Sequence, residues 1–195
     1  METILARKAY QQTISIKQLM LFVGSLLGDG YLDKTTRGYA MRIHHCFAQS
    51  EYVEYKYSFV ENLVNSKPKR SKNAYYFRTV SHPFFITLRK AFYLNRVKII
   101  PKDFLLENFD AFALAIWIMD DGAKDKNQLR INTQCFSLDE NKWLSEFLQA
   151  KFGIRTSINI DKGKYRLRIK EASMQLLRSL ILPYMIPSML YKLSL

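Results

Sequence analysis

Two apolar runs in the sequence each lead into acidic residues and a glycine. LMLFVGSLLGDG occupies residues 19–30, and ALAIWIMDDG occupies residues 113–122. An apolar run of about ten residues is too short for a bilayer span, which needs roughly 20, so each run predicts a buried helix. Carboxylates at the end of a buried helix are costly unless a cation meets them. The pattern therefore predicts a positively charged partner at the acidic end of each helix.

An alternating segment follows each apolar run. GYAMRIHHCF at 38–47 and NQLRINTQCF at 127–136 alternate apolar and polar residues, as half-buried strands do. In the first segment His45 shares the face of the apolar residues, and we expect the three histidines (His44, His45 and His82) to hydrogen-bond or pack rather than to form a zinc-type site. The polar faces carry hydrogen-bond donors: Arg42 and His44, then Arg130, Asn132 and Gln134.

The remaining segments repeat the same order in both halves. The pattern predicts amphipathic helices over 50–65 and 137–152, the second with a capping box from Ser137 to Glu140, and closing helices over 81–94 and 170–185. It predicts strands over 74–81 and a hairpin over 155–170 that turns at 161–163. Each half therefore reads helix, hairpin, helix, hairpin, helix. We expect two units, 1–105 and 106–195, with Pro101 near the boundary.

Matched residues support an internal duplication. The motif Asp-Gly-x-x-Asp-Lys follows each apolar run. Each of its four residues in the first half has an identical residue 92 positions later, as 121 minus 29 shows. The matched residues are Asp29, Gly30, Asp33 and Lys34 in the first half and Asp121, Gly122, Asp125 and Lys126 in the second.

Composition indicates a polyanionic partner. The 195 residues are 48% hydrophobic, enough for a packed core, and 30 Lys and Arg against 17 Asp and Glu give a net charge of +13. Nucleic acid explains this excess better than a membrane does. Cys46 and Cys135 are far apart and predict neither a disulfide framework nor a zinc ribbon. Residues 1–17 show no secretory signal, and with these cysteines we expect a reducing, intracellular compartment.

The acidic helix ends predict a metal site. Two such helices packed across a pseudo-twofold axis would bring Asp29 and Asp121 together, with Gly24 and Gly28 permitting close backbone approach. Adjacent carboxylates repel unless a divalent cation lies between them, and carboxylate oxygen favours Mg²⁺, Mn²⁺ or Ca²⁺. Asp120, aligned with Gly28, is expected to support the site or to be structural. The alternative is an ordinary helix end and turn. Beside a basic sheet, such a metal indicates phosphodiester hydrolysis.

These residues carry a resemblance to a known family. LFVGSLLGDGYL and LAIWIMDDGAK, with NRVKIIPKDF at 95–104 and LPYMIPSMLYKL at 182–193, are similar to the blocks of a single-chain LAGLIDADG homing endonuclease. The resemblance implies an α+β fold of two pseudo-symmetric αββαββα repeats, with central packed motif helices and saddle-shaped antiparallel sheets. It implies metal binding by Asp29 and Asp121 and catalytic support from Lys98 and Lys192, although each lysine could instead be a solvated surface residue.

The resemblance also implies an activity. The expected protein is a monomeric, intron-encoded, site-specific nuclease that hydrolyses both strands of DNA and leaves short 3′ overhangs. Mg²⁺ would be its cofactor, Mn²⁺ would substitute, and Ca²⁺ would support binding without cleavage. Two alternatives stay open on the same fold: a maturase that binds its own intron RNA, and a catalytically silent DNA-binding protein.

DNA would be read by the polar strand faces. A two-stranded ribbon fits the major groove, where Arg reads guanine and Asn or Gln reads adenine. The loop SKPKRSK at 66–72 would contact phosphates. The predicted DNA-binding residues are Arg42, His44, Arg78, Arg130, Asn132, Gln134, Asn159, Arg166 and Arg168 on strands, and Lys67, Lys69, Arg70 and Lys72 in the loop.

Overall fold

The structure is a computed structural model that describes residues 11–161 and 163–193. Most of the N-terminal segment tested for a secretory signal, and residue 162 of the expected hairpin turn, lie outside these ranges. Helix α2 (Ile16–Leu27) begins at Ser15, which forms a capping box with Gln18. Helix α6 (Ala111–Asp121) begins after Asp110, whose side chain accepts a hydrogen bond from the Ala113 backbone. Side-chain caps satisfy the free amides at both helix starts.

Two four-stranded antiparallel sheets have the same strand order, β1-β2-β4-β3 and β7-β8-β10-β9. The first contains β1 (Tyr31–Thr35), β2 (Gly38–Cys46), β3 (Lys69–Ser71) and β4 (Ala74–Arg78). The second contains β7 (Gly122–Asp125), β8 (Gln128–Ile131), β9 (Thr156–Asp161) and β10 (Lys164–Ile169). The predicted α+β fold with repeated antiparallel sheets is confirmed.

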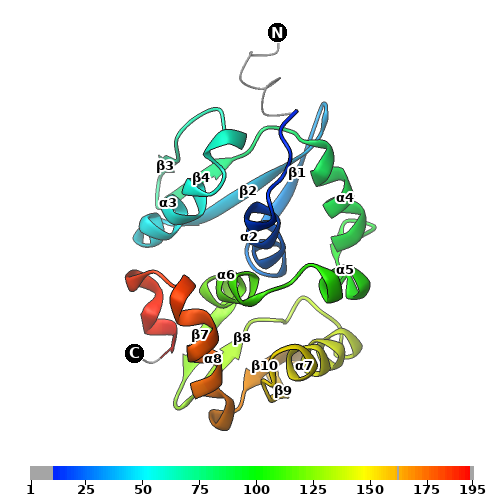
Figure 1. The fold of residues 1–195 in the computed structure, drawn as a ribbon, viewed down its shortest axis with the longest axis vertical. Helices are drawn as coiled ribbons and strands as arrows, with labels where there is room; N and C mark the ends of the chain where they lie inside the picture. Colours follow the sequence, from blue (N-terminus) through cyan, green and yellow to red (C-terminus); the bar gives the residue numbers. More distant parts are fainter. Residues whose placement is uncertain (1–10, 162, 194–195) are drawn as a thin grey trace.

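The remaining helices surround a central pair. Figure 1 shows α2 and α6 side by side at the centre, with the N-terminal elements on one side and the C-terminal elements on the other. The other helices are α3 (Ser50–Ser58), α4 (Pro83–Phe92), α5 (Lys102–Glu107), α7 (Leu138–Phe152) and α8 (Met174–Ile181), with 3-10 turns Phe47–Gln49, Glu61–Leu63, Glu171–Ser173, Leu182–Tyr184 and Pro187–Leu193. A small sheet pairs β5 (Tyr93–Leu94) with β6 (Val97–Lys98). Among the described residues, none of these helices combines the length and apolar character that a membrane crossing requires.

Glycines allow the two central helices to touch, as predicted. A Cβ atom on Gly24 would lie 2.4 Å from the carbonyl oxygen of Ala113, and one on Gly28 would lie 2.4 Å from the Cβ atom of Asp120. Neither distance can accommodate a side chain. The apolar residues of α6 from Phe112 to Met119 are all buried, so this helix pair is the centre of the core.

One predicted strand is shorter in the structure. The segment expected over 127–136 ends as a strand at Ile131, so Asn132 and Gln134 are not on a strand face. The reason is Thr133, which is buried and donates through its hydroxyl to Asn141 Oδ1 at 2.6 Å. The Thr133 carbonyl then accepts from the amide of Phe136 at 3.0 Å, which turns the chain.

Two further predictions are wrong in detail. The helix expected over 50–65 ends as α3 at Ser58, and a 3-10 turn follows. The basic segment 66–72, expected as a loop, contains the edge strand β3, whose Lys69 lies opposite Tyr76 of β4. Pairing with β4 satisfies the backbone of this segment despite its charge.

Candidate functional site

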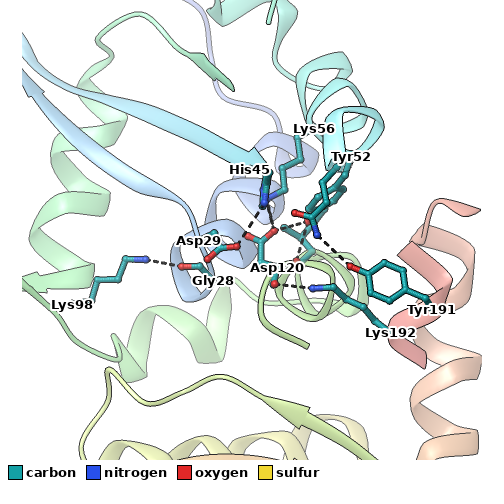
Figure 2. A network of polar contacts seen from close by, with 11 residues as sticks. Gly28, Asp29, His45, Tyr52, Lys56, Lys98, Asp120, Tyr191 and Lys192 are labelled. Atoms are coloured by element: carbon teal, nitrogen blue, oxygen red, sulfur yellow. Dashed lines mark hydrogen bonds and ion pairs between the residues drawn. The ribbon is translucent and has the colours of Figure 1, made fainter. Parts of the chain in front are cut away.

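Two lysines make the same contact in the two halves of the protein. Lys98, on β6, donates to the carbonyl oxygen of Gly28 at 2.8 Å. Lys192, in the 3-10 turn Pro187–Leu193, donates to the carbonyl oxygen of Asp120 at 2.8 Å. Figure 2 shows both lysines converging on the ends of the central helices. Since Gly28 and Asp120 also face each other, the two contacts are related as a pseudo-twofold axis requires.

The predicted acidic pair lies beside these contacts. Asp29 directly follows Gly28, and Asp121 is the last residue of α6. Burial, followed by the charges of Asp29 and Asp120, raises the pKa of Asp121 to about 8. Burial, followed by the charge of Asp120, also raises the pKa of Asp29. Three carboxyl groups therefore compete for the limited positive charge at one place.

Asp120 is held by an inner network. Its Oδ1 accepts a hydrogen bond from Lys56 Nζ at 2.6 Å and from the Tyr52 hydroxyl at 2.8 Å. The side chains of Lys56 and Asp120 are both 0% exposed, so this ion pair is removed from water. The Tyr52 hydroxyl also lies 3.1 Å from the carbonyl oxygen of Ile116. Helix α3 of the first half thus fixes a carboxylate of the second half.

His45 connects this network to Asp29. Its Nδ1 lies 3.7 Å from Asp29 Oδ2, and its Nε2 lies 3.7 Å from Asp120 Oδ1. Burial, then the charge of Lys56, lowers the pKa of His45 to about 4, which keeps the ring neutral near pH 7. We expected His45 to hydrogen-bond or pack, and in the structure its ring packs between the carboxylates of Asp29 and Asp120. The sequence signal was a single histidine on the apolar face of a predicted strand.

The arrangement fits a hard divalent cation. Asp29, His45 and Asp120 each offer a ligand atom, and these atoms lie within 4.8 Å of one another. Asp120 Oδ2 is buried and has no hydrogen-bond partner among the described residues. An unsatisfied buried oxygen and crowded carboxylates are what a cation would relieve. That Asp29 and Asp121 form the metal pair, with Gly28 and Asp120 beside them, stays a prediction.

The first sheet presents a broad basic hollow. Its volume is about 1210 Å³, and its lining includes six of the seven DNA-binding residues predicted in this half: Arg42, His44, Lys67, Lys69, Lys72 and Arg78. The seventh, Arg70, instead stacks on the Phe47 ring with its guanidinium carbon 3.9 Å from the ring centre. Arg42 and His44 are exposed while Ile43 between them is buried, as the alternating pattern predicted.

The second sheet carries a shorter row of basic side chains. Arg130 on β8 lies directly opposite Arg168 on β10, and Arg166 of β10 lies opposite Asn159 of β9. Leu167 is fully buried between the two arginines of β10, which places them on the uncovered face. The predicted strand residues therefore gather on one face in each half. The exceptions are Asn132 and Gln134, beyond the end of β8.

Comparison with protein families identifies this fold. A model of the LAGLIDADG DNA endonuclease family matches residues 19–177, a segment that contains most of α2, all of α6 and both sheets. The chain belongs to the LAGLIDADG DNA endonuclease family. The predicted resemblance is confirmed, and the acid-tipped helices α2 and α6 carry its two LAGLIDADG motifs.

Two curated relatives that span nearly the whole chain have different kinds of name. The chain is 31% identical over 93% of its length to "Cytochrome b mRNA maturase bI2" of Saccharomyces cerevisiae, and it spans 48% of that relative. It is 32% identical over 93% of its length to "Probable intron-encoded endonuclease 1" of Wickerhamomyces canadensis, of which it spans 85%. The chain therefore spans only about half of the maturase and most of the endonuclease.

Solved LAGLIDADG structures share the architecture. The homing endonuclease I-WcaI bound to its DNA recognition sequence matches with a TM-score of 0.89 and 29% identity, covering 98% of this chain and 92% of that chain. A structure of I-DmoI in complex with DNA and Mn matches with a TM-score of 0.52 and 17% identity, covering 88% of this chain and all of that chain. The second match supports the fold alone.

Proposed function

We propose that this protein is a monomeric, Mg²⁺-dependent endonuclease that cleaves both strands of one DNA site and leaves short 3′ overhangs. The observation that carries the proposal is the pair of lysine-to-carbonyl contacts on either side of the central acidic residues. A duplicated site of this kind matches a duplex, whose two strands are related by a twofold axis. The net charge of +13 supplies attraction for the polyanion.

The acidic residues would hold the metal. Asp29 and Asp121 are the principal ligands in this proposal, with the carbonyls of Gly28 and Asp120 beside them. Bound Mg²⁺ would activate water and stabilise the leaving oxygen, and Mn²⁺ would replace it, whereas Ca²⁺ would support binding only. His45, neutral because of its lowered pKa, lies between two carboxylates and limits their movement.

Lys98 and Lys192 would stabilise negative charge on the reacting phosphate. Each ammonium group is fixed by a carbonyl oxygen at 2.8 Å, so little reorientation is needed when a phosphate arrives. Burial lowers the pKa of both lysines, because desolvation disfavours the charged form. A phosphodiester would replace part of the lost hydration and restore the preference for the cation.

The test compares the wild type with Asp121→Asn on a randomised duplex library. We expect Mg²⁺ to give cuts at one sequence, and we expect the variant to bind the same sequence in Ca²⁺ while cutting it at least 100-fold more slowly. Asp139→Asn is the matched control, because Asp139 is 88% exposed on α7. Failure of the wild type to cut a library that contains the insertion junction of its host intron would refute the nuclease proposal. Selective binding without cutting would instead indicate a silent DNA-binding protein.

A second function has specific support. The relative from Saccharomyces cerevisiae is named an mRNA maturase, so assistance in splicing an intron RNA is the alternative. The acidic pair would then be structural. A splicing assay of the host intron with the double variant Asp29→Asn, Asp121→Asn separates the maturase from the nuclease. Splicing that is retained in this variant supports the maturase function. A wild type without any splicing activity, together with a variant that has lost cleavage, rules the maturase function out.

A further inference from the structure

We propose that Asp33 and Asp125 are positioning residues that set the base-reading arginines, one in each half of the protein. The inference rests on the proposed DNA binding and goes beyond it. Both aspartates belong to the repeated Asp-Gly-x-x-Asp-Lys frame, yet neither lies in the metal centre. Each lies on the first strand of a sheet, next to a pair of arginines.

In the first half, the pair is Arg42 and Arg78. These residues lie directly opposite each other on β2 and β4, so their side chains share the uncovered face of the sheet. Asp33 Oδ2 accepts from Arg42 Nε at 2.6 Å and lies 4.0 Å from Arg78 Nη1. The arginine side chains are 44% and 53% exposed, whereas that of Asp33 is 17% exposed. The carboxylate thus lies beneath two guanidinium groups that reach outward.

In the second half, the pair is Arg130 and Arg168. They also lie directly opposite each other, on β8 and β10. Asp125 Oδ2 lies 2.7 Å from Arg168 Nη2, and the two side chains are 24% and 33% exposed. The Nε atoms of Arg130 and Arg168 are buried without a hydrogen-bond partner among the described residues. The same three residue types therefore recur at the same strand positions.

The two triads differ in which arginine is held. Asp33 bonds the arginine of the second strand, Arg42, whereas Asp125 bonds the arginine of the last strand, Arg168. In both halves, the aspartate holds one guanidinium at hydrogen-bond distance, and in the first half its neighbour Arg78 lies farther away, at 4.0 Å. Like charges directly opposite on adjacent strands repel, and one carboxylate between them reduces the repulsion. The aspartate therefore allows two arginines to share one patch of the DNA-contact face.

A carboxylate at this place also acts against unselective binding. Arginine forms two hydrogen bonds with the O6 and N7 atoms of guanine in the major groove. A held arginine keeps its fork in one orientation, and the negative charge beneath it weakens purely electrostatic contacts with phosphate. Because the held arginines, Arg42 and Arg168, lie on strands that are not equivalent in the two sheets, the triads assign one guanine to each half-site without requiring equal distances from the centre.

The experiment selects duplexes from a randomised library in Ca²⁺ with the wild type, Asp33→Asn, Asp125→Asn and the control Asp139→Asn. The wild type is expected to select guanine at one position in each half-site. Asp33→Asn should reduce guanine discrimination on the order of tenfold at one of these positions, and Asp125→Asn at the other. Affinity for random DNA should rise in both variants, and the control should match the wild type.

Several outcomes would overturn the inference. A selected site that lacks a guanine in either half-site does so with the wild type alone, so the result does not depend on the folding of a variant. The inference is also overturned if both folded variants keep the base preference of the wild type. A uniform loss of preference across the whole site overturns it as well. Cleavage is scored separately with Mg²⁺. A selected site that is never cut refutes the nuclease proposal and leaves the triads standing.

Discussion

Replacing Asp121 with asparagine should stabilise the metal-free protein above neutral pH. The pKa of this carboxyl group is about 8 in the folded protein, against an ordinary value of 3.8. Between these values the folded chain holds a proton that the unfolded chain has released. The free energy of unfolding therefore falls as pH rises, and the stabilising effect of the bound proton is lost when pH passes 8.

His45 restricts the window in which this effect can be measured. Its pKa is lowered from 6.5 to about 4, so its contribution to stability is present above pH 6.5 and is lost as pH falls toward 4. Below pH 6.5 the two groups act in opposite directions. Between pH 6.5 and 8 the contribution of His45 is fully present, and one proton held on Asp121 gives about 1.4 kcal/mol per pH unit. The expected loss across this window is about 2 kcal/mol.

Urea unfolding in EDTA at pH 6.5, 7.2 and 8.0 measures this loss. The wild type and Asp139→Asn should lose about 2 kcal/mol across the series, and Asp121→Asn should remain nearly constant. At pH 8.0 the variant should be the more stable protein by at least about 2 kcal/mol. Parallel pH profiles for the wild type and Asp121→Asn would refute the assignment of a raised pKa to this carboxyl group.

Three further perturbations test the centre of the molecule. Gly28→Ala should destabilise by about 1–3 kcal/mol in urea unfolding, because its Cβ atom would meet that of Asp120; an unchanged midpoint would contradict the close contact. Lys56→Met should lower the free energy of unfolding by about 3–5 kcal/mol, because it leaves the Asp120 carboxylate buried and unpaired. Adding Asp120→Asn to this variant should recover part of the lost stability. Saturating Mg²⁺, at 100 times its dissociation constant, should raise wild-type stability by about 2.7 kcal/mol, with no such rise in Asp29→Asn.

Repetition made much of the fold predictable from the sequence. The matched spacing of Asp29 and Asp121, each after an apolar run, led to two helices that meet at the centre, and Gly24 and Gly28 indicated how closely. The capping box at Ser137 is also confirmed. The helices and the cap are local features, so a single chain segment contains the information that each needs, whereas the meeting of the two helices was inferred from the repetition itself. Element ends were less predictable, since Thr133 terminates β8 through a contact with α7.

The inner network around Asp120 was not predictable, because its contacts join residues that are far apart in the sequence. Lys56 stands among polar residues in the segment EYVEYKYS, where a lysine is normally a solvated helix residue. Its burial is tertiary, because its partner Asp120 comes from the other half of the chain. Tyr52 and His45 join the same network, and only the packing of α3 and β2 against α6 brings them together.

The difference between Gly28 and Asp120 shows how the duplicated centre departs from symmetry. These positions face each other across the central helices, and the space beside Gly28 is filled by the Asp120 side chain. Two aspartates could not fit there, so an acidic residue on one helix requires glycine on the other. The extra carboxylate in turn requires a buried cation, which Lys56 supplies from the first half only. In the second half the equivalent of His45 is Thr133, which bonds Asn141 instead. The two lysine-to-carbonyl contacts are preserved, so at this centre the asymmetry lies in the groups beneath them.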